Sequence, residues 1–111
     1  MRITDLAARL GAETIEAPDP AAEVREGYTS DLLSDVIAHA PPESALITIQ
    51  GHLNTVAVST LAGIRAILLA NNRPAPDDMR AAARREGIAI LRSPENQFVL
   101  SHRVHRLLHG P

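Results

Sequence analysis

Three short apolar runs, spaced about 21 residues apart and separated by segments of helical periodicity, constrain the fold of this chain most. The runs cover residues 46–49, 66–70 and 88–91. Polar residues do not alternate with apolar ones inside them, so both faces of each strand are expected to be buried. Strands of this kind that alternate with helices are typical of a parallel sheet. The pattern predicts an α/β fold: a single three-layer domain over residues 1–111, with a small, mostly parallel sheet flanked by helices.

The first part of the chain predicts a helix and a short strand before these runs. Thr4 is placed to cap a helix over residues 5–10, because its hydroxyl could accept a hydrogen bond from a free amide of the first turn. Residues 13–16 are expected to form an edge strand, and the proline-containing stretch 17–23 is expected to form a surface loop.

A strand over residues 24–29 is predicted to lead into the first main helix, and Ser30 or Asp31 is placed to cap that helix. Prolines at 41 and 42 end it. Apolar residues at 3.6-residue spacing predict one buried side for this helix, formed by Leu32, Leu33, Val36, Ile37 and Ala40.

A helix is also expected after each of the three apolar runs. Asn54 is expected to cap the first of them, and Asp77 and Asp78 are expected to begin the second. The third is predicted to begin at Ser93, with Pro94 in its first turn.

Composition excludes several classes of function. The chain carries a net charge of −2 and has one tyrosine and one phenylalanine, which argues against nucleic acid as a partner. It has no cysteine, so neither a disulfide nor a thiol nucleophile is possible. No apolar run reaches membrane-spanning length and the amino terminus is too polar for a signal peptide. We therefore expect a cytoplasmic protein without a membrane partner.

No motif predicts catalysis, a cofactor or a metal. The sequence contains no phosphate loop, nucleophile elbow, zinc-protease helix or dinucleotide fingerprint. Three histidines share a side of the last helix, but no carboxylate on that side completes a metal site, so we expect them to face solvent. They are His102, His105 and His109. Arg80, Arg84 and Arg85 are expected to form a solvated basic strip.

Polar residues gather where the predicted strands end, and these are the candidate ligand-binding residues. In an open α/β sheet the ligand lies outside the carboxyl ends of the strands. Each candidate also has a structural interpretation, as a helix cap or an ordinary loop residue. A histidine in this position could alternatively exchange protons near neutral pH. The candidates are Thr29, Ser30, Asp31, Gln50, Gly51, His52, Asn54, Asn71 and Asn72.

Four motifs resemble the DRTGG domain family over roughly residues 1–108. They are V-x-x-G-Y-T-S-D-L-L-S-D-V at 24–36, L-I-T-I-Q-G-H at 46–52, N-x-V-A-V at 54–58 and A-x-x-E-G-I-x-I-L at 83–91. The resemblance implies a small α/β regulatory module, similar in fold to the amino-terminal domain of HPr kinase/phosphorylase. Such modules occur alone, beside some phosphate acetyltransferases and between CBS domains in certain pyrophosphatases.

The resemblance also implies partners. Dimers recur among these modules, stand-alone members accompany iron-only hydrogenase systems, and no catalytic activity is established for the stand-alone type. One departure concerns the turn after the second apolar run, where many relatives have Gly-Gly and this chain has Asn71 and Asn72. Asparagine tolerates a left-handed backbone, so the turn is expected to survive, although a ligand that needs close backbone approach would be excluded.

Three classes of function follow from these observations. The first is a non-catalytic regulatory module, homodimeric, that binds a small anionic metabolite or nucleotide at the strand ends. The helix after residue 54 is rich in small residues and could pack closely against a second subunit. The second is an assembly module for a redox enzyme. The third is a small hydrolase or transferase that uses His52 with Asp31 or Asp35.

Overall fold

The apolar runs form the centre of a five-stranded sheet. The structure, a computed structural model, describes residues 1–111 and contains five helices and five strands. In chain order the elements are α1 (Ile3–Leu10), β1 (Glu13–Glu16), β2 (Glu26–Thr29), α2 (Leu33–His39), β3 (Ser44–Thr48), α3 (Leu53–Ala62), β4 (Ala66–Leu69), α4 (Asp77–Glu86), β5 (Ala89–Arg92) and α5 (Gln97–His109).

The sheet is mostly parallel, as predicted. Its strand order is β1-β5-β4-β3-β2, and the pairs β2–β3, β3–β4 and β4–β5 are all parallel. β1 pairs antiparallel with β5 at one edge, and a register shift between Thr14 and Glu16 interrupts that pairing. The expected edge strand over residues 13–16 is therefore confirmed.

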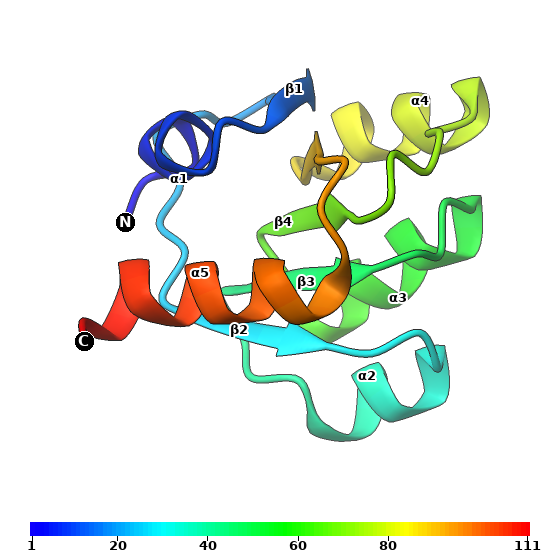
Figure 1. Ribbon diagram of the computed structural model, residues 1–111. Coiled ribbons are helices and arrows are strands. Elements are labelled where there is room, and N and C mark those ends of the chain that lie inside the picture. Colours follow the sequence, from blue (N-terminus) through cyan, green and yellow to red (C-terminus); the bar gives the residue numbers. More distant parts are fainter.

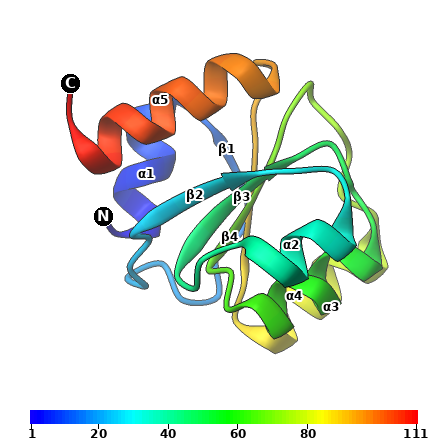
Figure 2. The ribbon, with the colours of Figure 1, turned by 90° about the horizontal axis from the view of Figure 1, so that it is seen from below.

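Helices cover both faces of the sheet, so the fold has three layers (Figures 1 and 2). α1 and α5 lie on one face, while α2, α3 and α4 lie on the other. Neighbouring residues of one strand point to opposite faces: Leu68 packs in the cluster with α1 and α5, and Ile67 packs with α3 and α4. Both side chains are fully buried, which is why these strands contain no polar alternation.

Four of the five predicted helix starts are wrong, and only α4 begins where predicted, at Asp77. In α1, α3 and α5 the proposed cap has another partner or position. α1 begins at Ile3, and the Thr4 hydroxyl donates to the carbonyl oxygen of Pro20 at 3.0 Å instead of capping the helix. α3 begins at Leu53, so Asn54 lies inside its first turn. α5 begins at Gln97 and not at Ser93; its cap is Asn96, whose side chain accepts from the Val99 amide at 2.9 Å.

The buried side predicted for α2 is only partly correct. Val36 is buried, but Leu32 is 64% exposed and Ile37 is 51% exposed. Leu32 also precedes the helix, and neither Ser30 nor Asp31 caps it. The strand before it begins at Glu26, two residues later than predicted.

The arginine strip on α4 holds the edge strand rather than lying free in solvent. Arg80 Nε donates to Glu16 Oε1 at 3.1 Å, and Arg84 Nη1 donates to the same oxygen. Glu16 is nearly buried at the end of β1. Arg85 conforms to the prediction, since it is exposed and contacts only the adjacent Glu86.

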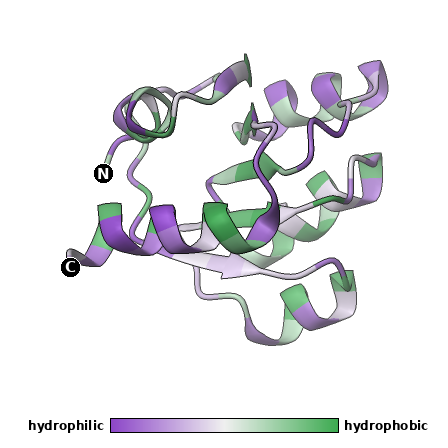
Figure 3. Cartoon of the chain, in the orientation of Figure 1, coloured by the Kyte–Doolittle hydropathy of each residue, from purple (hydrophilic) through white to green (hydrophobic).

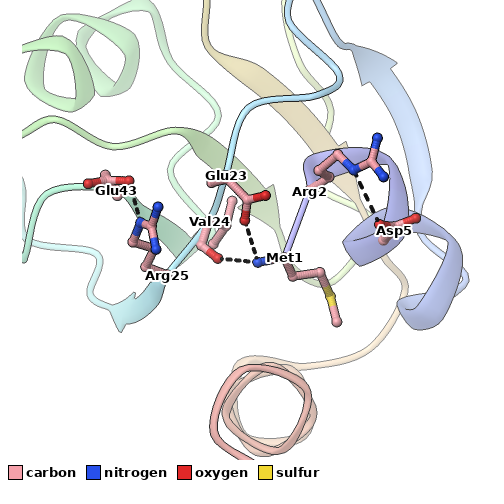
Figure 4. Close-up of polar contacts among 7 residues, drawn as sticks. All are labelled: Met1, Arg2, Asp5, Glu23, Val24, Arg25 and Glu43. Carbon is pink, nitrogen blue, oxygen red and sulfur yellow. Dashed lines mark hydrogen bonds and ion pairs between the residues drawn. The ribbon is translucent and has the colours of Figure 1, made fainter.

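Polar contacts also close the edge of the sheet where the parallel strands begin (Figure 4). The amino terminus donates to Glu23 and to the carbonyl oxygen of Val24, and Arg25 pairs with Glu43 at 2.8 Å. The hydrogen bond from the amino terminus, and then its charge, lowers the pKa of Glu23. These contacts attach α1 and the start of β2 to the start of β3.

α1, α4 and α5 are amphipathic, whereas α3 is mostly apolar and shows little separation of polar from apolar residues. In Figure 3, hydrophilic and hydrophobic segments alternate along α5, whose buried residues include Leu100 and Val104. None of the five helices combines the length and the apolar character needed to cross a membrane.

Candidate functional site

The four parallel strands end along one edge of the sheet, and backbone hydrogen bonds tie their exits together. The amide of Ser30 donates to Ile47, that of Ala70 donates to Thr48, and that of Ser93 donates to Leu69. We call this edge the strand-end rim; it comprises residues 29–31, 49–54, 70–73 and 93–97. All nine candidate residues belong to it, and their ligand-binding role remains a prediction.

Asp31 connects several segments of the rim through hydrogen bonds. Its Oδ1 accepts hydrogen bonds from the Thr48 hydroxyl, the Ile49 amide and the Gln97 side-chain amide, each at 2.9 Å. Thr48 in turn accepts from the Gln50 amide at 3.1 Å. One carboxylate thus joins the exit of β2, the exit of β3 and the start of α5. This explains why Asp31 does not cap α2.

Gln50 also has structural partners. Its side-chain amide donates to the Asp31 carbonyl oxygen at 3.0 Å, and its own carbonyl oxygen accepts from the Thr55 hydroxyl at 2.7 Å. Both ends of the residue therefore hold neighbouring segments. Gln50 shapes the rim and has limited freedom to reach a ligand.

Gly51 allows the start of α3 to approach the loop after β4. A Cβ atom at Gly51 would lie 2.4 Å from the carbonyl oxygen of Pro74, a separation that side chains do not tolerate. The loop itself turns at Asn71 and Asn72, which have positive φ values of 56° and 54°. Their amides donate to Glu95 and Ser93. Asparagine thus supports the left-handed turn, as expected.

His52 and Asn54 are exposed and lie at the start of α3. His52 occupies the N-cap position without a side-chain cap, and the amides of Leu53 and Asn54 have no hydrogen-bond partner. Free amides at a helix start favour negative charge, and the helix dipole adds to this preference. The exposed groups on this part of the rim are therefore mostly hydrogen-bond donors.

Thr29 and Ser30 face other neighbours. The Thr29 hydroxyl hydrogen-bonds to Ser101 at 2.6 Å and lines a hollow of about 210 Å³ between β2 and α5. Ser30 Oγ accepts from the Leu32 amide at 3.2 Å. Five of the nine candidates are exposed: Thr29, His52, Asn54, Asn71 and Asn72. Ser30, Asp31, Gln50 and Gly51 are half-buried.

Two rim residues escaped the sequence analysis. Arg73 is exposed, follows the Asn71–Asn72 turn and forms no ion pair; the next residue, Pro74, lies against Gly51, just before α3. The sequence could have indicated Arg73 as a candidate, because a guanidinium directly follows the predicted turn. Gln97 was expected inside a helix that begins earlier, and its contact with Asp31 spans 66 residues, so no local pattern could have identified it.

Asp31 and Asp35, the proposed catalytic partners of His52, bond to other groups. The Tyr28 hydroxyl donates to Asp35 Oδ2 at 2.7 Å. This hydrogen bond raises the pKa of Tyr28 above its ordinary value, with desolvation and the carboxylate charge adding to the effect. The same bond, aided by Ser30, lowers the pKa of Asp35. His52 makes no hydrogen bond with either aspartate.

The carboxyl-terminal histidines are exposed, as predicted. His109 Nε2 hydrogen-bonds to Glu26 Oε1 at 2.7 Å, and the rings of His105 and His109 lie 5.1 Å apart. No group of three or more histidine, aspartate or glutamate side chains is arranged to hold a metal ion.

By sequence, the chain matches no family model and no curated protein. By structure, it is similar to the CBS and DRTGG domains of the regulatory region of a Clostridium perfringens pyrophosphatase, solved in complex with its activator, diadenosine tetraphosphate. The TM-score is 0.73 at 10% identity. The similarity covers 93% of this chain and 45% of that one. What the two share is the fold. The finding supports the DRTGG-like architecture expected from the sequence, and this chain spans under half the length of its neighbour.

We predict that Asp31 and Gln97 stabilise the fold as a coupled pair. Asp31→Ala should lower the free energy of unfolding by about 2 kcal/mol or more, because three donors lose a charged acceptor. In a double-mutant cycle with Gln97→Ala, the coupling should be about 0.5–1.5 kcal/mol. Urea unfolding measures both. The pair Asp77→Ala and Gln97→Ala makes no contact and should be additive; equal behaviour of the two cycles would contradict the prediction.

We predict that Tyr28, the only tyrosine, titrates above the ordinary value of about 10. Asp35→Asn should move its phenolate absorbance transition to lower pH, because the charged acceptor is lost. Asp77→Asn should not change that transition.

The same hydrogen bond makes stability depend on pH. The stabilisation that comes from the raised pKa of Tyr28 is present below the ordinary tyrosine pKa and is lost as pH rises through the raised pKa. That from the lowered Asp35 pKa is present above the ordinary aspartate value and is lost as pH falls through the lowered one. Identical transitions in wild type and Asp35→Asn would refute the link.

Proposed function

We propose that residues 1–111 form a single domain that acts as a non-catalytic regulatory module and binds a small anionic metabolite or nucleotide at the strand-end rim. The observation that carries the proposal is the start of α3, where the amides of Leu53 and Asn54 lack partners. Gly51 brings this start against the loop that carries Arg73. Free amides and an unpaired guanidinium, carried by two loops that meet at the carboxyl ends of parallel strands, suit an anion.

The carboxylate of Asp31 does not argue against this proposal. One of its oxygens already accepts three hydrogen bonds from within the protein, and these donors offset its negative charge. The exposed polar side chains of residues 52–54 and 71–73 are amides, an imidazole and a guanidinium: Asn54, Asn71, Asn72, His52 and Arg73.

Two further observations support a binding role over catalysis. His52 has no carboxylate partner that could orient it as an acid or base. In addition, the solved structure with a similar fold is a regulatory region complexed with a nucleotide activator. For this chain we therefore favour a nucleotide or another phosphorylated metabolite as the ligand.

We predict that the rim binds adenine nucleotides or pyrophosphate in NMR titrations that follow the amides of rim residues. The variant His52→Ala/Arg73→Gln should weaken binding about tenfold or more, because it removes two donors to the anion. The matched control His39→Ala/Arg65→Gln removes the same residue types from the opposite edge of the sheet and should bind like wild type. Amide shifts at Gly51 and Asn72 in NMR spectra would locate the ligand. The proposal would be contradicted if the protein bound neither adenine nucleotides nor pyrophosphate, or if the control variant lost as much affinity as the rim variant.

We further propose that the module is a homodimer formed through α3. Leu53, Ala57 and Leu61 recur every four residues and share one face of the helix; Leu61 is 76% exposed. They line an apolar groove of about 370 Å³ beside α4, with Arg85 and Glu86 at its border. A two-fold axis beside Ala57 would place Leu53 of one copy on Leu61 of the other, with opposite charges at the border of each contact.

We predict that Leu61→Glu yields a monomer in sedimentation velocity, because it would bury a charge in the α3 contact. Phe98→Glu changes an equally exposed apolar residue on α5, in the other outer layer, and should leave the dimer intact. A monomeric wild type, or dissociation by Phe98→Glu alone, would contradict this interface. The alternative of assembly with a redox enzyme remains a prediction from the sequence, and no contact in the structure favours it.

A further inference from the structure

A hollow of about 350 Å³ lies between the end of α1 and the middle of α5. We call it the α1–α5 hollow. No carboxylate lines it, although the whole chain carries a net charge of −2. Its lining residues are Arg9, His102, Arg103, Arg106 and Leu107. Cations gathered in a concave surface produce a local positive field that concentrates anions.

Arg103 builds this hollow. Its guanidinium donates to the carbonyl oxygens of Leu10 and Arg9, each at 3.1 Å, and to Glu95 Oε2 at 2.7 Å. The two carbonyls lie in the last turn of α1, where they lack helical partners. Arg103 therefore fixes α5 against α1, and its own charge is largely offset by Glu95.

The other two arginines of the hollow have no such partner. Seven of the eleven basic residues, all arginines, form ion pairs with carboxylates. Arg9 and Arg106 are among the four that do not, and both are exposed. His102 lies one helical turn before Arg106 on the same side of α5 and is also free of hydrogen bonds. The hollow thus presents two unused guanidinium groups and one imidazole.

We propose that the α1–α5 hollow binds a free anion with at least two linked phosphate groups, held by Arg9, Arg106 and His102. The planar fork of arginine matches phosphate oxygens bidentately. The cations come from two helices around a volume larger than a single phosphate. The lining has one leucine and no aromatic ring, so it has no platform on which a base could stack. The hollow recognises the phosphate chain, and it shares no residue with the strand-end rim.

Titration with tripolyphosphate, followed by NMR at the amide of His102 inside the hollow, tests the site. Arg9→Gln/Arg106→Gln should weaken binding about tenfold or more. Arg2→Gln/Arg65→Gln removes the same charge from exposed positions outside the hollow and should bind like wild type. Arg9→Lys/Arg106→Lys keeps the charge but lacks the planar guanidinium, so its affinity should lie between those of wild type and Arg9→Gln/Arg106→Gln. No binding to wild type, or equal weakening by the control pair, would overturn the proposal.

NMR titration separates this site from the rim. Tripolyphosphate should shift the amides of Arg9, His102 and Arg106 in wild type and equally in His52→Ala/Arg73→Gln. ATP should shift them with similar affinity, and adenosine should not shift them. Shifts confined to the rim, or shifts with adenosine, would refute the hollow without affecting the proposed function. Co-sedimentation with phosphoinositide vesicles, without binding of free tripolyphosphate, would also overturn it by assigning the hollow to a membrane surface.

Discussion

Burial of both faces of the three central strands, β3, β4 and β5, is the constraint on which the rest of this structure depends. Strands without polar side chains can be covered only by helices on both sides, and the connections through those helices keep the strands parallel. Ile67 and Leu68 show the consequence, since these neighbours pack in different layers. Parallel pairing then brings all four strand exits to the same edge. The position of the rim therefore follows from the hydrophobic pattern before any polar residue is considered.

Parallel strands alone would leave four unconnected loops at that edge. Asp31 converts them into a defined surface, because its carboxylate holds the exit of β3 and the start of α5 while its backbone holds Gln50. Gly51 adds the loop after β4 to the same surface. The polar candidates thus divide into residues that build the rim and residues that it exposes. Sequence position alone does not distinguish these two groups.

The sequence predicted the strands and layers because a buried parallel strand has a local signature. The Asn71–Asn72 turn was predictable for the same reason, since tolerance of positive φ belongs to the residue itself. Apart from α4, which begins at Asp77 as predicted, the helix starts were not predictable, because a capping side chain can prefer a distant partner. Thr4 bonds to Pro20, and Asp31 bonds to Thr48 and to Gln97. The local sequence favours both residues as helix caps. In the folded chain, however, Thr4 donates to a distant carbonyl oxygen, and Asp31 accepts from more donors than a cap would provide.

The arginine strip on α4 failed for a related reason. A run of charges on a helix normally faces solvent, but Glu16 lies in a strand 64 residues from Arg80. Only the topology, which places α4 beside the antiparallel edge, brings them together. Because the neighbouring edge strand ends on the nearly buried carboxylate of Glu16, Arg80 and Arg84 bind this strand instead of facing solvent.

The arginines as a group show how structural and ligand-facing charge can be separated. Pairing with a carboxylate marks an arginine as part of the framework, and Arg103 is an example. Lack of a pair is not sufficient to mark a site: Arg65 is unpaired and exposed, but it lies at the opposite edge from the rim and lines none of the hollows described above. Arg73 differs because its loop packs against Gly51, just before the unused amides of α3, and Arg9 differs because it shares a hollow with Arg106, which is also unpaired. Glu95 supports both places, since its carbonyl holds Asn71 and its carboxylate holds Arg103. The rim and the α1–α5 hollow therefore have different donors but rest on one common residue.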